Sequence, residues 1–157
     1  MKTDTIIKIR GYHIDHFGHV NHARYIEFLE EARWDYMETN NLINLFHQTK
    51  IIHVVAGVCV KYKKSARAYD TIKIKTYLEK AAHVSFTMGQ NIFLDNTLIV
   101  EAEITNVFID INHQNTIKPD KALISGWPDL CSCLNSTRSN SNWLNSNSLK
   151  QKEVKHG

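Results

Sequence analysis

The chain has 157 residues, of which 43% are hydrophobic and 22% are charged, and its formal net charge is +3. This composition supports one domain with an ordinary core and leaves no room for separate cofactor and substrate domains. The mild charge, without a long basic stripe, argues against nucleic-acid binding, and no apolar run is long enough to span a membrane.

The first third of the chain predicts a strand, a turn and a long helix. Residues 5–12, TIIKIRGY, form a β-branched strand segment, and Gly18 marks a turn. Asn21 is a suitable helix N-cap, and Asn40 with Asn41 favours a stop. The apolar face of this helix recurs at steps of three and four residues: Tyr25, Phe28, Leu29, Ala32 and Tyr36.

From residue 51 onward the pattern is that of strands. The segments IIHVVAGVCVKYK, DTIKIKTYLEK, HVSFTMGQNIFL and LIVEAEITNVFIDI are long and rich in Val, Ile, Thr and Phe. Asp95-Asn96 predicts a turn between the last two. One strand, one long helix and a meander of strands predict an α+β domain in which an antiparallel sheet curls around the helix.

The composition changes after Trp127-Pro128, where Asn, Ser and Lys dominate. A segment of this kind buries too little apolar surface to offset the entropy of ordering it. We therefore expect one domain at residues 1–127 and a disordered tail at residues 128–157.

Histidines recur at every third position in HIDHFGHVNHARYIEFLEEAR, at His13, His16, His19 and His22. On an unbroken helix they would share a face, but Gly18 and the N-cap at Asn21 interrupt any such helix. No HExxH motif or second ligand cluster accompanies them. The pattern disfavours a metal site.

Asp15 lies between a strand and the start of a helix, where free backbone N–H groups suit a carbonyl oxygen that gains negative charge. A carboxylate there could attack a carbonyl or activate water, which is the chemistry of acyl transfer or hydrolysis. The alternative is that Asp15 caps a turn and His22 merely begins a helix. Composition alone favours this structural alternative.

The motif DHFGHVNHARYIEFLEEAR resembles the signature of the hotdog-fold acyl-CoA thioesterases of the 4-hydroxybenzoyl-CoA thioesterase type. The similarity extends over roughly residues 5–125. It implies a hotdog fold, with a long central helix wrapped by a curled antiparallel sheet. It also implies homodimers, which in some relatives pair into homotetramers, with active sites at the dimer interface.

The resemblance implies a role for each motif residue. Asp15 falls on the catalytic carboxylate, as nucleophile or general base, and the backbone N–H near His22 falls where relatives polarise the thioester carbonyl. The His22 imidazole would orient Asp15, water or substrate. Gly18 permits the close turn, and the residues expected to shape the acyl pocket and support the loop are Val20, Asn21 and Tyr25. No metal or other cofactor is implied, because coenzyme A enters as part of the substrate.

Candidate contacts for the coenzyme A nucleotide are basic residues outside the motif. Lys63, Lys64 and Arg67 could bind phosphates, and His83 lies in the turn where some relatives use arginines. A solvated strand end explains the basic run equally well. We expect Glu31, where another hotdog branch has its catalytic acid, to be structural.

The resemblance implies an acyl-CoA thioesterase, with an acyl-carrier-protein thioesterase or a non-catalytic acyl-thioester-binding module as alternatives. The basic run could attract an acidic carrier protein. The N-terminus lacks a secretory signal, and the three cysteines lack zinc-site spacing. We therefore expect a cytoplasmic protein.

Overall fold

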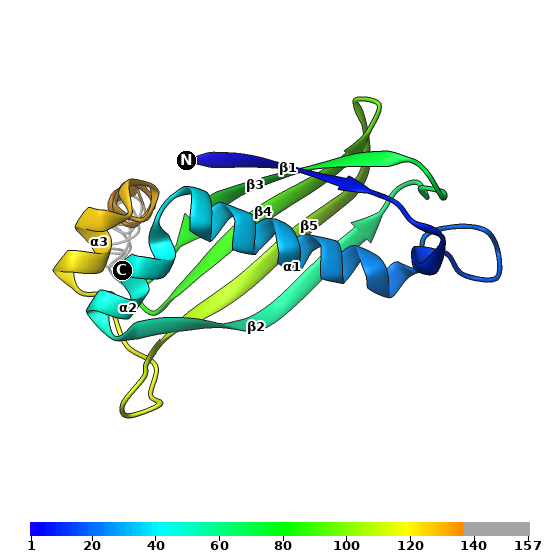
Figure 1. The fold of residues 1–157 in the computed structure, drawn as a ribbon. Helices are drawn as coiled ribbons and strands as arrows, with labels where there is room; N and C mark the ends of the chain where they lie inside the picture. Colours follow the sequence, from blue (N-terminus) through cyan, green and yellow to red (C-terminus); the bar gives the residue numbers. More distant parts are fainter. Residues whose placement is uncertain (137–157) are drawn as a thin grey trace, which may run out of the picture.

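The computed structural model describes residues 1–136, which include five strands, three labelled α-helices and a further helical segment at residues 128–136 (Figure 1). The elements in chain order are β1 (Lys2–Lys8), a 3-10 turn (Gly11–His13), α1 (His22–Thr39), α2 (Leu42–Thr49), β2 (Ile51–Tyr62), β3 (Thr71–Ala81), β4 (Ser85–Leu94), β5 (Thr97–Asp110) and α3 (Lys121–Gly126).

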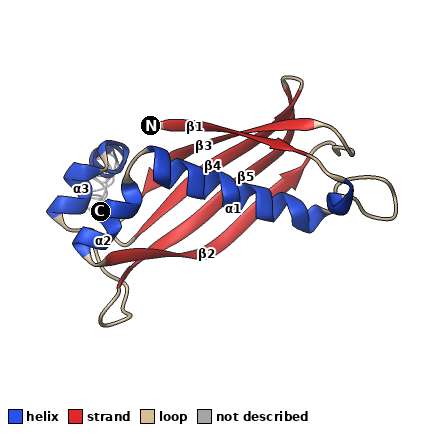
Figure 2. Ribbon diagram, in the orientation of Figure 1, coloured by secondary structure: helices blue, strands red, loops and turns tan. Residues whose placement is uncertain are grey.

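All five strands form one antiparallel sheet in the order β1-β3-β4-β5-β2. The sheet curls around α1, which lies along its inner face, while α2 and α3 gather at one end (Figure 2). The loop that precedes α1 lies at the opposite end. The predicted α+β hotdog architecture is confirmed, and β1 and β2 are its two edge strands.

The central helix begins and ends where the sequence predicts. The Asn21 side chain accepts a hydrogen bond of 2.9 Å from the Ala23 backbone N–H, and Asn40 is the C-cap. Asn41 follows in the left-handed conformation with φ of 55°. The residues of the predicted apolar face are all buried: Tyr25, Phe28, Leu29, Ala32 and Tyr36.

The structure differs from the prediction at several short elements. The first strand spans residues 2–8 rather than 5–12, because the chain turns into the 3-10 segment after Arg10. The helices α2 and α3 were not predicted, since each is too short for a strong periodic pattern. Tertiary packing holds them together: the Phe46 ring of α2 meets the Trp127 ring at 6.0 Å between centroids.

The folded unit continues beyond the expected boundary at residue 127. Residues 128–136 are also helical, and Leu130 is fully buried among the side chains of the core. The burial of this leucine explains why the first part of the Asn/Ser-rich segment is ordered. The remainder of the predicted tail, residues 137–157, lies outside the described residues. Within residues 1–136, no helix combines the length and apolar character needed to cross a membrane.

Candidate active site

A tight loop leads into the start of α1. The Asp15 N–H donates to the His19 carbonyl at 2.8 Å, and the Gly18 N–H donates to the Asp15 carbonyl at 3.1 Å. Gly18 has φ of +79°, a conformation that a residue with a Cβ rarely adopts. The loop closes on an isolated bridge between Ile14 and Val20, which sets the direction of the chain into the helix.

The Asp15 carboxylate uses one oxygen within the loop, and its other oxygen has no partner among residues 1–136. Oδ1 accepts hydrogen bonds from the backbone N–H groups of Phe17 at 2.9 Å and His19 at 3.3 Å. No described residue donates to Oδ2. The turn-capping role and a chemical role for Asp15 are therefore compatible, because they use different oxygens.

The first turn of α1 leaves one backbone donor free near this carboxylate. The Ala23 N–H donates to the Asn21 side chain, and the Arg24 N–H donates to the Asn21 carbonyl at 2.9 Å. Among residues 1–136 no acceptor faces the N–H of His22, and this residue is exposed. A free donor at a helix start is suited to a negatively charged oxygen.

An open depression of about 360 Å³ brings most of the predicted residues together. It lies between the loop, the start of α1 and the segment that follows β2. Its lining residues are Asp15, Val20, His22, Tyr25, Tyr62, Lys63, Lys64 and Ser65.

Tyr62 and Ser65 also line this depression and were not singled out in the sequence. The Tyr62 hydroxyl donates to the His22 carbonyl at 3.0 Å, and the Ala66 N–H donates to the Tyr25 hydroxyl at 2.9 Å. Burial is the main cause that raises the pKa of Tyr25, so its phenol stays protonated. The sequence feature that could have pointed to Tyr62 is its position as an aromatic residue inside the basic run VKYKK.

Three other predicted residues support the loop or lie elsewhere. Gly18 and Asn21 form the turn and the helix cap rather than the lining. Arg67 does not line the depression, although its backbone N–H donates to Asp70 at 2.7 Å and closes the next turn. The side chain of Asn21 is thus a capping group, not a pocket wall.

His83 lies at the opposite end of the sheet from Asp15 in the same chain. Lys63 bonds to Ile99 at the start of β5, whereas the β3–β4 turn meets β5 near Val107. At the usual rise of a strand, Ile99 and Val107 are about 27 Å apart along β5. Within one protomer, His83 and the depression are therefore separate.

The two lysines of the lining differ in their electrostatic environment. The Lys63 ammonium pairs with Glu101 at 3.2 Å, and both side chains are partly exposed. No carboxylate of the described residues pairs with Lys64, whose backbone N–H bonds to the Ile99 carbonyl at 3.2 Å. Lys64 is the better placed of the two for an anionic ligand.

The remaining histidines of the motif are separated from the depression. His13 is buried, and its Nδ1 accepts a hydrogen bond of 3.0 Å from the Arg10 backbone N–H. Burial lowers its pKa, so this imidazole stays neutral. His16 is exposed and stacks on Phe17. In the described part of the chain, no three His, Cys, Asp or Glu side chains are grouped to hold a metal ion.

Glu31 lies on a different side of α1. It is exposed and lines a shallow depression toward β1, together with Ile6, Tyr12 and Glu27. Glu31 is not among the residues that line the depression at Asp15, and its structural role stays a prediction.

Comparison with known proteins identifies the family. The model of the thioesterase-like superfamily matches residues 9–129. The chain belongs to this superfamily. It is 37% identical over 115 residues to the long-chain acyl-CoA thioesterase FadM of Escherichia coli K12, across 72% of this chain and 87% of FadM.

Two further relatives agree with this thioesterase-like assignment. The acyl-CoA thioesterase YbgC of Haemophilus influenzae is 23% identical over 102 residues, covering 64% of this chain and 75% of YbgC. The crystal structure of YbaW from Escherichia coli superposes with a TM-score of 0.74 and 35% identity, covering 78% of this chain and 94% of YbaW.

Proposed function

We propose that this protein hydrolyses an acyl-CoA thioester to a free carboxylic acid and coenzyme A. The observation that carries the proposal is that Asp15 and His22 line one depression, and that within residues 1–136 neither Oδ2 of Asp15 nor the backbone N–H of His22 has a hydrogen-bond partner. The superfamily membership and the similarity to acyl-CoA thioesterases support it.

In this mechanism Asp15 acts on the thioester carbonyl carbon through Oδ2, either as a nucleophile or as a general base that removes a proton from water. The loop hydrogen bonds to Oδ1 keep the carboxylate in position. As the carbonyl oxygen becomes negative, the His22 N–H donates to it. In the general-base route the water oxygen bonds to the carbonyl carbon, the C–S bond breaks, and the proton held by Asp15 passes to the departing thiolate. In the nucleophilic route Oδ2 bonds to the carbonyl carbon as the C–S bond breaks, and water then hydrolyses the resulting mixed anhydride to the free acid and restores the Asp15 carboxylate.

The imidazole of His22 is proposed to orient water or substrate beside Asp15. Its exposure at the mouth of the depression supports this role, because the ring is free to contact an incoming group. Val20 and Tyr25 form the buried inner wall of the depression. In this proposal the acyl chain starts at that wall.

The nucleotide of coenzyme A is proposed to contact Lys64 first, with Lys63 contributing after its ion pair with Glu101 rearranges. Phosphate groups favour ammonium partners in a solvent-exposed site of this kind. The same positive surface suits an acidic carrier protein, so an acyl-carrier-protein thioester is the second substrate to test.

We also propose a homodimer in which two β2 strands pair at their edges. β2 is uncharged from Ile51 to Val60, and Val54, Val55 and Val58 are 43–47% exposed. The other edge strand, β1, carries Lys2, Asp4 and Lys8, and charges of this kind protect a free edge. Pairs of such dimers would give the homotetramer that the family resemblance implies.

Antiparallel pairing of two β2 strands has a consequence for the site. It brings the β3–β4 turn of one protomer, which carries His83, to the end of the sheet where the other protomer carries Asp15. His83 and the second protomer's basic segment could then serve one nucleotide. Since coenzyme A thioesters are cytoplasmic metabolites, the proposal also includes the cytoplasmic location expected from the sequence.

The test is release of free thiol from a panel of acyl-CoAs and acyl-carrier proteins by the purified full-length chain. Asp15→Asn keeps an oxygen for the loop N–H groups but removes the charge, and we expect kcat to fall by about 100-fold or more. Turnover unaffected by Asp15→Asn would refute the role of Asp15. Binding without thiol release from any substrate would favour the non-catalytic module.

A further inference from the structure

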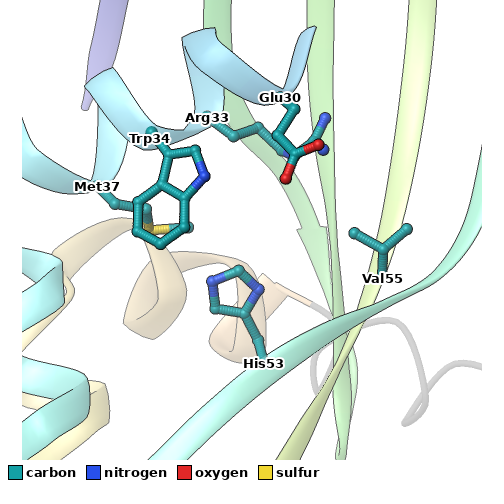
Figure 3. Close-up of a pocket in the computed structure, with 6 residues that line it drawn as sticks. All are labelled: Glu30, Arg33, Trp34, Met37, His53 and Val55. Atoms are coloured by element: carbon teal, nitrogen blue, oxygen red, sulfur yellow. The ribbon is translucent and has the colours of Figure 1, made fainter. Parts of the chain in front are cut away.

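A second pocket lies between α1 and β2, farther along the helix than Asp15 (Figure 3). Its volume is about 210 Å³. It combines an aromatic and aliphatic wall with three ionisable groups. The lining residues are Glu30, Arg33, Trp34, Met37, His53 and Val55.

An apolar strip of β2 leads from the catalytic depression toward this pocket. Val55 and Val58 pair with Asn106 and Ile104, which are buried beneath α1, so both valines point toward the helix. Each valine is 47% exposed. Along α1, the distance from His22 to Arg33 is about 16 Å at the rise of an α-helix. This span suits a long acyl chain that starts at the thioester.

Arg33 supplies hydrogen-bond donors to the pocket. Its Nη1 donates to Gln90 Oε1 at 3.0 Å. The Gln90 amide is fully buried and fixed, because its Nε2 donates to the Leu29 carbonyl at 2.9 Å and to the Thr76 hydroxyl at 3.0 Å. No hydrogen bond from the guanidinium to another acceptor is present among the described residues, although the negative charge of Glu30 acts on it, so part of its set of five N–H groups remains available to a ligand.

His53 supplies a hydrogen-bond acceptor. Asn106 Nδ2 donates to the Ile104 carbonyl at 3.1 Å, so Asn106 Oδ1 must face His53 Nδ1, also at 3.1 Å. Nδ1 therefore carries the proton, and Nε2 keeps its lone pair. Burial lowers the pKa of His53, which keeps the ring neutral. The ring points toward Trp34 and Met37.

Given the proposed thioesterase function, on which this inference rests, we propose that the second pocket binds a hydroxyl group near the distal end of the acyl chain. Arg33 donates to the hydroxyl oxygen, and His53 Nε2 accepts the hydroxyl hydrogen. A terminal carboxylate fits less well, because it would meet the lone pair of Nε2 and the negative charge of Glu30, which lines the same pocket. A terminal methyl group would offer no hydrogen-bond partner to the remaining N–H groups of Arg33 or to Nε2 of His53.

The experiment compares hydrolysis of ω-hydroxydodecanoyl-CoA and dodecanoyl-CoA by the full-length wild-type protein. We expect kcat/KM to be about tenfold higher for the hydroxylated chain, the discrimination typical of one buried hydrogen-bonded hydroxyl. In His53→Phe, which removes the acceptor but retains a ring, we expect the ratio of the two kcat/KM values to fall close to one. The same substitution at exposed His113, in the turn after β5, is the matched control and should keep the wild-type ratio.

The outcomes separate this inference from the proposed function. Hydrolysis of both chains at equal kcat/KM by the wild type, or a ratio that His53→Phe leaves unchanged, would overturn the hydroxyl site alone. No thiol release from these two chains or from any other member of the acyl-CoA and acyl-carrier-protein panel would overturn the proposed function and this inference with it. If the His53→Phe variant does not fold, the wild-type ratio of kcat/KM for the hydroxylated chain to kcat/KM for dodecanoyl-CoA still tests the inference.

Discussion

The hydroxyl of Tyr62, the last residue of β2, donates a hydrogen bond of 3.0 Å to the carbonyl oxygen of His22, the first residue of α1. This contact joins the edge strand to the helix start across the depression that holds Asp15. A hydrogen bond therefore connects the edge strand to the start of α1, although the two residues are 40 positions apart in sequence.

Tyr62→Phe should reduce kcat by up to about tenfold, because a small displacement of the His22 N–H weakens its contact with the reacting oxygen. The loss of one exposed hydrogen bond should cost only about 0.5–1 kcal/mol of unfolding free energy. Steady-state kinetics and thermal melting measure the two effects. Tyr69→Phe, at a tyrosine that is 75% exposed, is the control. Equal kcat in Tyr62→Phe and wild type would contradict the prediction.

Asn21→Ala should lower the free energy of unfolding by about 1 kcal/mol, because the Ala23 N–H loses its side-chain acceptor at the start of α1. Asn21→Ser should retain most of the stability, since a hydroxyl oxygen also caps this position. Urea denaturation followed by circular dichroism measures the difference. If the alanine variant were as stable as wild type, capping by Asn21 would have no measurable role.

Lys64→Ala should raise the KM for acyl-CoA about three- to fivefold, the effect expected when one exposed charge pair with phosphate is lost. The kcat should stay the same, because the nucleotide is remote from the reacting carbonyl. An acyl-N-acetylcysteamine thioester lacks the nucleotide, so its KM should be equal in both proteins. A parallel rise of KM for both thioesters would contradict nucleotide binding by Lys64.

Val54→Lys should produce monomers, because it adds a charge to the apolar edge where two β2 strands are proposed to pair. Ile6→Lys places the same charge on the opposite edge strand, at a residue that is 60% exposed, and should leave the assembly unchanged. Light scattering after size-exclusion chromatography gives the mass of each species. A wild-type protein that is monomeric at micromolar concentration would rule out this dimer.

Stability should decrease as the pH falls below about 6.5, the ordinary pKa of histidine. Burial lowers the pKa of His53 in the folded state, so the unfolded chain binds more protons in the range below that value. The contribution of His53 is thus present above pH 6.5 and lost as the pH falls toward the folded-state pKa. Urea midpoints should drop from about pH 8 to about pH 5. The drop should be smaller in His53→Phe, and an equal drop would assign the effect to His13 and other groups.

The sequence predicted the long elements of this fold correctly. The apolar face of α1, from Tyr25 to Tyr36, repeats through several turns, and the strands from Ile51 to Asp110 carry long β-branched runs. A hydrophobic pattern of that length predicts its element well, because one residue that departs from the pattern has little effect on it. The short helices α2 and α3 have no such repeat, and the buried rings of Phe46 and Trp127 hold them only once the chain is folded.

For the site, the sequence alone determined the loop–helix motif, because Asp15, Gly18, Asn21 and His22 are neighbours whose turn and cap are local. Only the tertiary structure decided what faces that motif. The antiparallel register brings Tyr62 and Lys64 to Asp15 and puts His83 at the far end of the same sheet. Contacts between distant segments depend on strand order and register, and a residue pattern within one segment contains neither.

Local sequence places the Asp15 carboxylate beside the start of α1, whereas the depression that both line is produced by the way the sheet closes. Local hydrogen bonds form between residues a few positions apart, so their partners can be read directly along the chain. The depression exists because the curled sheet holds the end of β2 beside the start of α1, and that arrangement is a property of the complete fold.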